Sequence, residues 1–163
     1  MTARDVIKTA LTSTQNLLNW YLSDLSDADL AVRPVPTANT IAWQLGHLIN
    51  AEVGLLKDLP GARYPELPGA FKEQYTNKTS QIAPAGGYMK KAEYVDWFNK
   101  VRAASLENVD RLGESDLDKP NNNVVAQFAP TLGALLVLIA NHTLMHAGQF
   151  TVVRRALNKP VLF

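Results

Sequence analysis

Residues 132–157 read LGALLVLIANHTLMHAGQFTVVRRAL, and this stretch decides the fold. At about 100° per residue, its large apolar side chains fall within one arc of a helix. They are Leu132, Leu135, Leu136, Ile139, Phe150, Val153 and Leu157. Pro130 precedes the stretch and Pro160 follows it, which suits the two ends of a helix. The pattern predicts a helix from about residue 130 to 157 with one face in a core.

Three other segments have the same helical spacing of apolar residues. They run from about residue 3 to 25, 41 to 59 and 91 to 112. Asn39 or Thr40 is the expected cap of the second helix, and Gly113 is the expected stop of the third. Nothing strand-like is of comparable strength. The sequence therefore predicts an all-α, antiparallel four-helix bundle with long connections, whose exact topology stays open.

The connection from residue 60 to 89 is too rich in proline and glycine for a long regular element. A connection of this length in a small domain is usually functional or partly mobile. Its aromatic residues indicate that it packs onto the bundle; they are Tyr64, Phe71, Tyr75 and Tyr88. This segment is expected either to cover a site and select substrate or only to pack.

Composition limits the classes of function. The 163 residues are 47% hydrophobic and 19% charged with a formal net charge of +1, which suits one globular domain over residues 1–163. That charge gives no reason to expect nucleic acid or an anionic membrane as a partner. The run from Leu132 to Ala140 is too short to span a bilayer, and residues 1–5 lack the features of a signal peptide. We expect a cytoplasmic protein.

The chain contains no cysteine and only three histidines, His47, His142 and His146. Any metal site must therefore use nitrogen and oxygen ligands, and any thiol must come from another molecule. Because His142 and His146 are four residues apart, both imidazoles point from one face of the predicted helix. His47 lies within the predicted second helix, so the three are expected to bind one divalent metal ion. The alternative is a structural niche in which the imidazoles bond to neighbouring polar groups.

Two further polar residues lie near these histidines in the helical pattern. Glu52 falls among leucines and is a candidate fourth ligand or base, although pairing with Arg102 or Tyr21 is the more common role of such a carboxylate. Gln149 is one turn after His146 and is a candidate for orienting a ligand, or else a core or capping residue.

Two stretches resemble the signatures of the DinB-like (damage-inducible, YfiT-like) superfamily. The first comprises residues 29–34 (DLAVRP), residues 39–48 (NTIAWQLGHL) and Glu52. The second comprises residues 141–149 (NHTLMHAGQ) and residues 154–157 (RRAL). The resemblance covers nearly the whole chain. It implies a four-helix bundle, frequently dimeric, with zinc or nickel at His47, His142 and His146. Asn158 stands where a glycine is common, and asparagine tolerates the left-handed conformation.

Members of that superfamily include bacillithiol-dependent and mycothiol-dependent S-transferases and a thiol-dependent maleylpyruvate isomerase. The first hypothesis is therefore a metal-dependent enzyme that transfers a low-molecular-weight thiol to a small electrophilic substrate. The second is a metal-dependent hydrolase of small molecules, with water as the nucleophile. The third is a non-catalytic, dimeric stress-response or metal-binding protein. Because structural zinc sites usually have four protein ligands, a closing fourth ligand would favour the third hypothesis.

Overall fold

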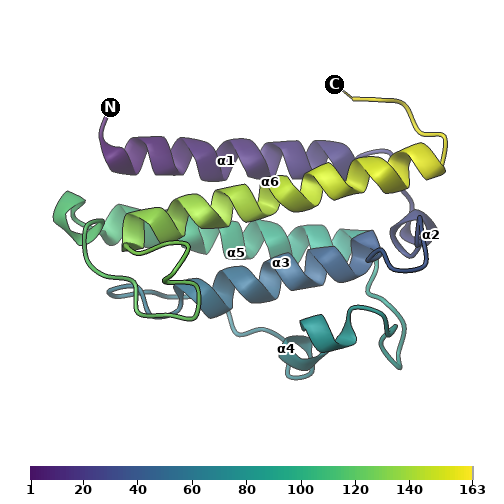
Figure 1. Ribbon diagram of the computed structural model, residues 1–163, viewed down its shortest axis with the longest axis horizontal. Helices are drawn as coiled ribbons and strands as arrows, with labels where there is room; N and C mark the ends of the chain where they lie inside the picture. Colours follow the sequence, from purple (N-terminus) through teal and green to yellow (C-terminus); the bar gives the residue numbers. More distant parts are fainter. Residues whose placement is uncertain (163) are drawn as a thin grey trace.

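Four long helices make up about half of the chain in the computed structural model, which describes residues 1–162 (Figure 1). They are α1 (Ala3–Leu22), α3 (Ile41–Leu56), α5 (Lys91–Arg111) and α6 (Leu132–Ala156). Two one-turn helices, α2 (Asp27–Leu30) and α4 (Phe71–Gln74), and two 3-10 turns, Asn77–Thr79 and Glu114–Asp116, lie in the connections. The described residues contain no β-strand, only an isolated bridge between Pro120 and Thr131. The all-helical class is thus confirmed.

Threonine side chains set the beginnings of three long helices. The hydroxyls of Thr2, Thr40 and Thr131 accept hydrogen bonds from backbone N–H groups three residues on, in α1, α3 and α6 respectively. Each bond satisfies one of the free donors of a first helical turn. The expected cap of α3 is therefore Thr40. After α6, Asn158 adopts a left-handed backbone with φ of 54°, as the sequence predicts at that position.

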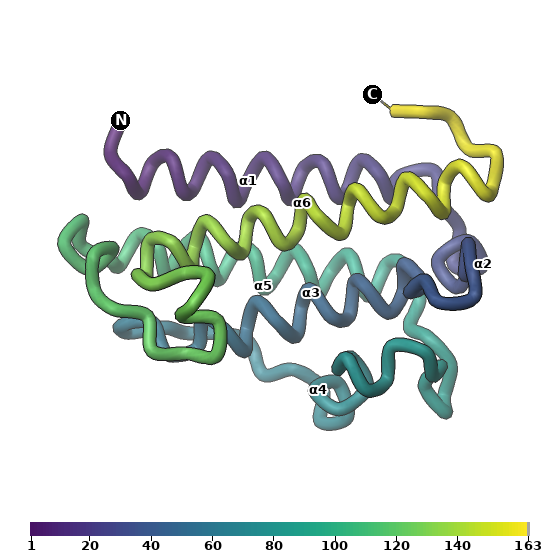
Figure 2. Tube along the Cα trace, viewed as in Figure 1, coloured from purple at the N-terminus to yellow at the C-terminus, as the bar shows by residue number. Residues whose placement is uncertain are grey.

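The direction of the four helices places the histidines. Figures 1 and 2 show α1 and α6 running one way and α3 and α5 running the other. α1 packs against α5 and α6, and α3 packs against the same two helices. The contacts between α3 and α6 are thus antiparallel, whereas α1 and α6 run in parallel. The N-terminal half of α3 consequently faces the C-terminal half of α6.

Several predicted boundaries were wrong. The first helix ends at Leu22 instead of about residue 25, and the second ends at Leu56 instead of about residue 59. The short helices α2 and α4 were not predicted, because a single turn carries too little periodicity to be recognised. The segment from residue 60 to 89 packs onto the bundle as predicted, since Phe71 and Tyr75 are buried in the core.

Helix α6 is long and apolar enough, by length and composition alone, to qualify as a membrane span. In the fold, 44% of its most apolar window is buried against the rest of the chain. A central helix of a water-soluble bundle has the same properties. Its buried residues include Leu136, Ile139 and Phe150, which agrees with the predicted inner face.

Candidate metal centre

The three histidines form one cluster between α3 and α6. His47 lies on α3, and His142 and His146 lie one turn apart on α6. One ring nitrogen from each of the three can be chosen so that all lie within 4.8 Å of one another. The Nε2 atoms of His142 and His146 are 3.1 Å apart. The prediction that these three residues come together is therefore confirmed for their positions in the fold.

His146 is held by a glutamine that the sequence analysis did not identify. Its Nδ1 lies 2.8 Å from Oε1 of Gln44, and both side chains are buried. Because the amide oxygen can only accept, Nδ1 carries the proton, and Nε2 is left facing His142. A hydrogen bond of this kind fixes the tautomer and ring orientation of metal-binding histidines. Gln44 is one turn before His47 on the same helix, and this spacing is the sequence feature from which its role could have been predicted.

His47 is fixed by an aromatic ring on one side and by the segment from residue 60 to 89 on another. Its imidazole stacks on the indole of Trp43, with ring centroids 4.8 Å apart and planes inclined by 8°. Its side chain also hydrogen-bonds to the backbone of Tyr75. Both contacts restrict rotation of the ring, so the imidazole is oriented before any ligand arrives.

Gly46 lets Tyr75 reach this position. A Cβ atom at Gly46 would lie 2.3 Å from a carbon of the Tyr75 ring, well inside van der Waals contact. The Tyr75 hydroxyl is 2.7 Å from the Tyr94 hydroxyl on α5. Only glycine at position 46 therefore admits the aromatic ring that ties the long connection to both α3 and α5. This part of the connection supports the histidine cluster and does not only fill space.

The cluster is electrostatically suited to a cation. Burial lowers the pKa of His146 from 6.5 to about 3, and the nearby His142 and His47 lower it further in the same direction. Burial and the proximity of His47 lower the pKa of His142 to about 4. Burial also lowers the pKa of His47, partly opposed by its bond to Tyr75. All three imidazoles are therefore neutral at pH 7, which is the form that binds metals.

The donor set fits one divalent transition metal ion. Three neutral imidazoles suit zinc, nickel, copper and iron, and they bring no negative charge of their own. In residues 1–162 no carboxylate joins the three histidines in the cluster. The residues that would hold the ion are His47, His142 and His146, with at least one coordination position left open.

Glu52 has a structural role instead. Its two carboxylate oxygens accept hydrogen bonds from Nε and Nη2 of Arg102, each at 2.9 Å, and Ser105 donates a further one. Arg102 also donates to the Leu11 carbonyl on α1 and to the Thr143 hydroxyl on α6. Arg102 lies on α5, so its guanidinium ties that helix to the other three long helices. A structural pairing with Arg102 or Tyr21 was the favoured prediction; Arg102 is confirmed as a partner, and Glu52 is not placed as a fourth ligand.

Two other residues singled out from the sequence, Gln149 and Tyr64, lie outside the histidine cluster. Gln149 lines a separate cavity with Gln44, and its side chain makes no hydrogen bond within the described chain. The Tyr64 hydroxyl hydrogen-bonds to Ser105, which itself donates to Glu52, so Tyr64 faces the Glu52–Arg102 pair. Burial raises the pKa of Tyr64 to about 12, and the phenol stays protonated.

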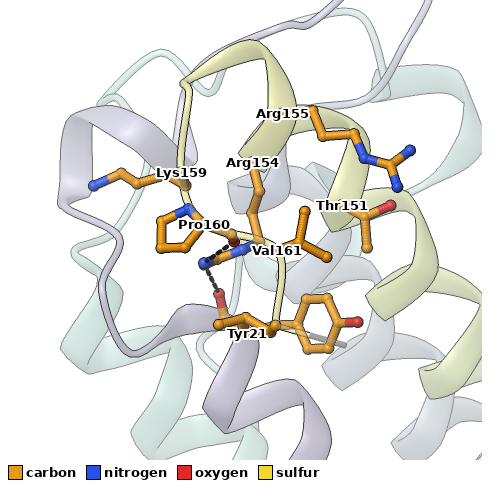
Figure 3. A pocket seen from close by; sticks show the side chains of 8 residues that line it. Tyr21, Thr151, Arg154, Arg155, Lys159, Pro160 and Val161 are labelled. Atoms are coloured by element: carbon orange, nitrogen blue, oxygen red, sulfur yellow. Dashed lines mark hydrogen bonds between the residues drawn. The ribbon is translucent and has the colours of Figure 1, made fainter.

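A cavity of about 190 Å³ lies away from the histidines, where the C-terminal segment crosses the end of α1 (Figure 3). Arg154 enters it with a buried guanidinium that bonds to the carbonyls of Tyr21 and Pro160 and to Asp24. Asp24 has a lowered pKa because Arg154 hydrogen-bonds to it. The buried charge is therefore already neutralised, and the cavity offers no chemistry comparable to the histidine cluster.

Comparison with known proteins identifies the family. The model of the DinB superfamily matches residues 10–150. Among solved structures, the crystal structure of a conserved protein from Enterococcus faecalis matches with a TM-score of 0.65 and 14% identity, over 98% of this chain and 99% of that one. At that identity the likeness shows the fold alone. No curated protein is similar enough to be matched. With most of its length covered by the family model, the chain belongs to the DinB superfamily.

Proposed function

We propose that His47, His142 and His146 hold one divalent metal ion, zinc or nickel, and that the protein transfers a low-molecular-weight thiol to a small electrophile. The observation that carries the proposal is the set of three neutral imidazoles within 4.8 Å, unaccompanied by a carboxylate in the described chain. In this proposal the chain is one domain, a four-helix bundle in which two pairs of helices run in opposite directions. It acts in the cytoplasm as a homodimer.

The pairing of Glu52 with Arg102 favours an enzyme over a structural metal site. A structural zinc site is normally closed by four protein ligands. Here Glu52, the acidic residue nearest to His47 in the sequence, is neutralised by two hydrogen bonds from Arg102. A three-histidine site with an open position is typical of catalytic zinc.

The residues of the chain would supply position and a dry environment. When bound, a divalent ion supplies a Lewis acid that favours the thiolate form of a small thiol. Gln44 and the Tyr75 backbone hold the imidazoles in place, and the Trp43 indole excludes water from one face of His47. In the transfer, the thiol sulfur forms a bond to the electrophilic carbon, the leaving group departs with the electron pair, and the thiol proton passes to solvent.

The same open position supports the hydrolase alternative, with water in place of the thiol. The transferase and the hydrolase both require the metal for a reaction, whereas a non-catalytic protein would only bind the metal or a ligand. The assay for thiol transfer therefore has to be separated from the assay for metal binding.

Elemental analysis tests the metal, and conjugation tests the reaction. Untagged protein purified without chelator is expected to hold close to one equivalent of zinc or nickel, and His142→Ala is expected to lose it. The loaded protein should then conjugate small thiols to monochlorobimane faster than His47→Ala does. Absence of metal from wild type, with no rise in melting temperature on adding zinc or nickel, overturns the metal site. Metal binding with no conjugation above the variant overturns the transferase.

A further inference from the structure

A cavity of about 400 Å³ lies beside the histidine cluster. One wall is the connection from residue 34 to 39, and the other is α6 at Gln149, Val152 and Val153. Gln44 of α3 forms part of the lining. A cavity of this size is within the range of small-molecule sites. It lies next to the metal ligands because Gln44 contacts both the cavity and His146.

Helix geometry places this cavity one turn from the cluster. On α6, His142, His146, Gln149 and Val153 follow one another at spacings of four, three and four residues, which is one stripe of a helix. On α3, Gln44 is one turn before His47. Because α3 and α6 run in opposite directions, both steps lead the same way (Figure 2). No histidine lines the cavity itself, so Gln44 is the residue that connects the cavity to the cluster.

The lining contains no ionisable side chain. Its polar groups are the amides of Asn39, Gln44 and Gln149 and the hydroxyl of Thr37, and its apolar groups come from proline, valine and alanine. The side chains of Gln149 and Thr37 are exposed and make no hydrogen bond to another residue of the described chain, so a bound molecule would replace water at these groups. A carboxylate or phosphate would find no cation here to offset its loss of water. An uncharged molecule with a carbonyl or amide group would find both donors and apolar contact.

We propose that this cavity binds the body of the electrophilic substrate, and that the substrate is an uncharged small molecule with at least one carbonyl or amide group. The proposal rests on the proposed function only in naming the occupant as that substrate. Gln149 recognises the polar group of the substrate, and the valines contact its apolar part. The reacting end extends along α6 to the three histidines.

A matched pair of probes tests the charge preference on metal-free protein. Benzamide and benzoate have the same size and differ in charge, and their binding can be followed by NMR through the Gln149 side-chain amide and the valine methyl groups. Benzamide is expected to shift the signals of Gln149 and Val152 and to bind at least tenfold more tightly than benzoate. Equal or tighter binding of benzoate, or shifts confined to other residues, overturns the proposal.

Two substitutions on the exposed surface of α6 locate the site. Gln149→Trp fills the cavity and is expected to abolish the benzamide shifts. Leu144→Trp adds the same bulk to an exposed position outside the cavity lining and is expected to leave them unchanged. If Gln149→Trp binds benzamide as wild type does, this cavity is not the site.

Cobalt separates this proposal from the proposed function. Paramagnetic Co²⁺ bound at the histidines should speed the relaxation of benzamide protons, and His142→Ala should remove that effect. If cobalt does not bind wild type, the metal site fails while the benzamide titration of metal-free protein still decides the cavity. If cobalt binds and bound benzamide shows no enhanced relaxation, the placement of the substrate beside the metal is overturned.

Discussion

Two polar clusters lie inside the bundle, one around Glu52 and Arg102 at the centre of the four long helices and one of three histidines between α3 and α6, and they differ in how completely the protein satisfies them. In the Glu52–Arg102 cluster, the arginine makes five hydrogen bonds, which uses its whole donor capacity. In the histidine cluster, His142 and His146 face one another, and no charged group of the described chain joins them. The first cluster is complete without a ligand.

The difference shows which cluster is structural. A satisfied buried ion pair holds elements in register and leaves nothing for a substrate to bind. A group of neutral, desolvated imidazoles leaves lone pairs for a cation. Since Thr143, which bonds to Arg102, is the neighbour of His142, the structural cluster also fixes the helix that carries two of the ligands.

The largest expected effect comes from breaking the Glu52–Arg102 pair. Arg102→Met leaves the buried Glu52 carboxylate without a cation, and we expect a loss of about 3–5 kcal/mol in the free energy of unfolding. The double variant Glu52→Met with Arg102→Met should lose markedly less, because no charge remains buried. Urea denaturation measures both. A single variant within about 1 kcal/mol of wild type would contradict a structural role for the pair.

A smaller effect is expected at Gly46. Gly46→Ala forces the Tyr75 ring away from α3, with a loss of about 1–3 kcal/mol in stability and weaker metal binding as the bond to His47 is disturbed. Gly54→Ala, on the same helix with open space around it, should gain about 0.5–1 kcal/mol. Thermal melts without zinc measure the change in stability, and melts with zinc measure the change in metal binding. Identical behaviour of the two variants would refute the support of His47 by Tyr75.

Gln44 tests the orientation of the histidine cluster. Gln44→Leu removes the acceptor for His146 Nδ1, and metal affinity is expected to fall about 10- to 100-fold. Gln149→Leu, in the cavity but without a bond to a histidine, should leave metal affinity unchanged. Competition with a chromogenic chelator measures the dissociation constants. A loss in Gln149→Leu equal to that in Gln44→Leu would show that Gln149 joins the metal site.

The smallest effect is a pH dependence of the metal-free protein. Because the folded pKa of His146 is lowered from 6.5 to about 3, its contribution to stability is complete above pH 6.5 and is lost as the pH falls toward 3. Between pH 7 and 6 the loss should be about 0.7 kcal/mol for this histidine. In His146→Gln, the free energy of unfolding measured by urea denaturation should fall less steeply between pH 7 and 6 than in wild type. Equal slopes in the two proteins would mean that His146 is exposed to water.

Much of the candidate site could be predicted from local spacing. His142 and His146 share a face because four residues make about one turn, and this holds in any helix. Glu52 falls on the apolar face of α3, so its need for a partner was visible without a structure. The roles of Gln44 and Tyr75 were not predicted, because His146 and Gln44 are 102 residues apart and no periodicity links them.

The sequence by itself determined the helices, their apolar faces and the presence of three histidines on two of them, because these follow from the period of the α-helix and from composition. Only the tertiary structure decided which of the four long helices run in the same direction, that Arg102 pairs with Glu52, and that Tyr75 packs on Gly46. Such contacts depend on the shapes and charges of side chains far apart in the chain. They decide which buried polar groups are satisfied by the protein and which are left for a ligand.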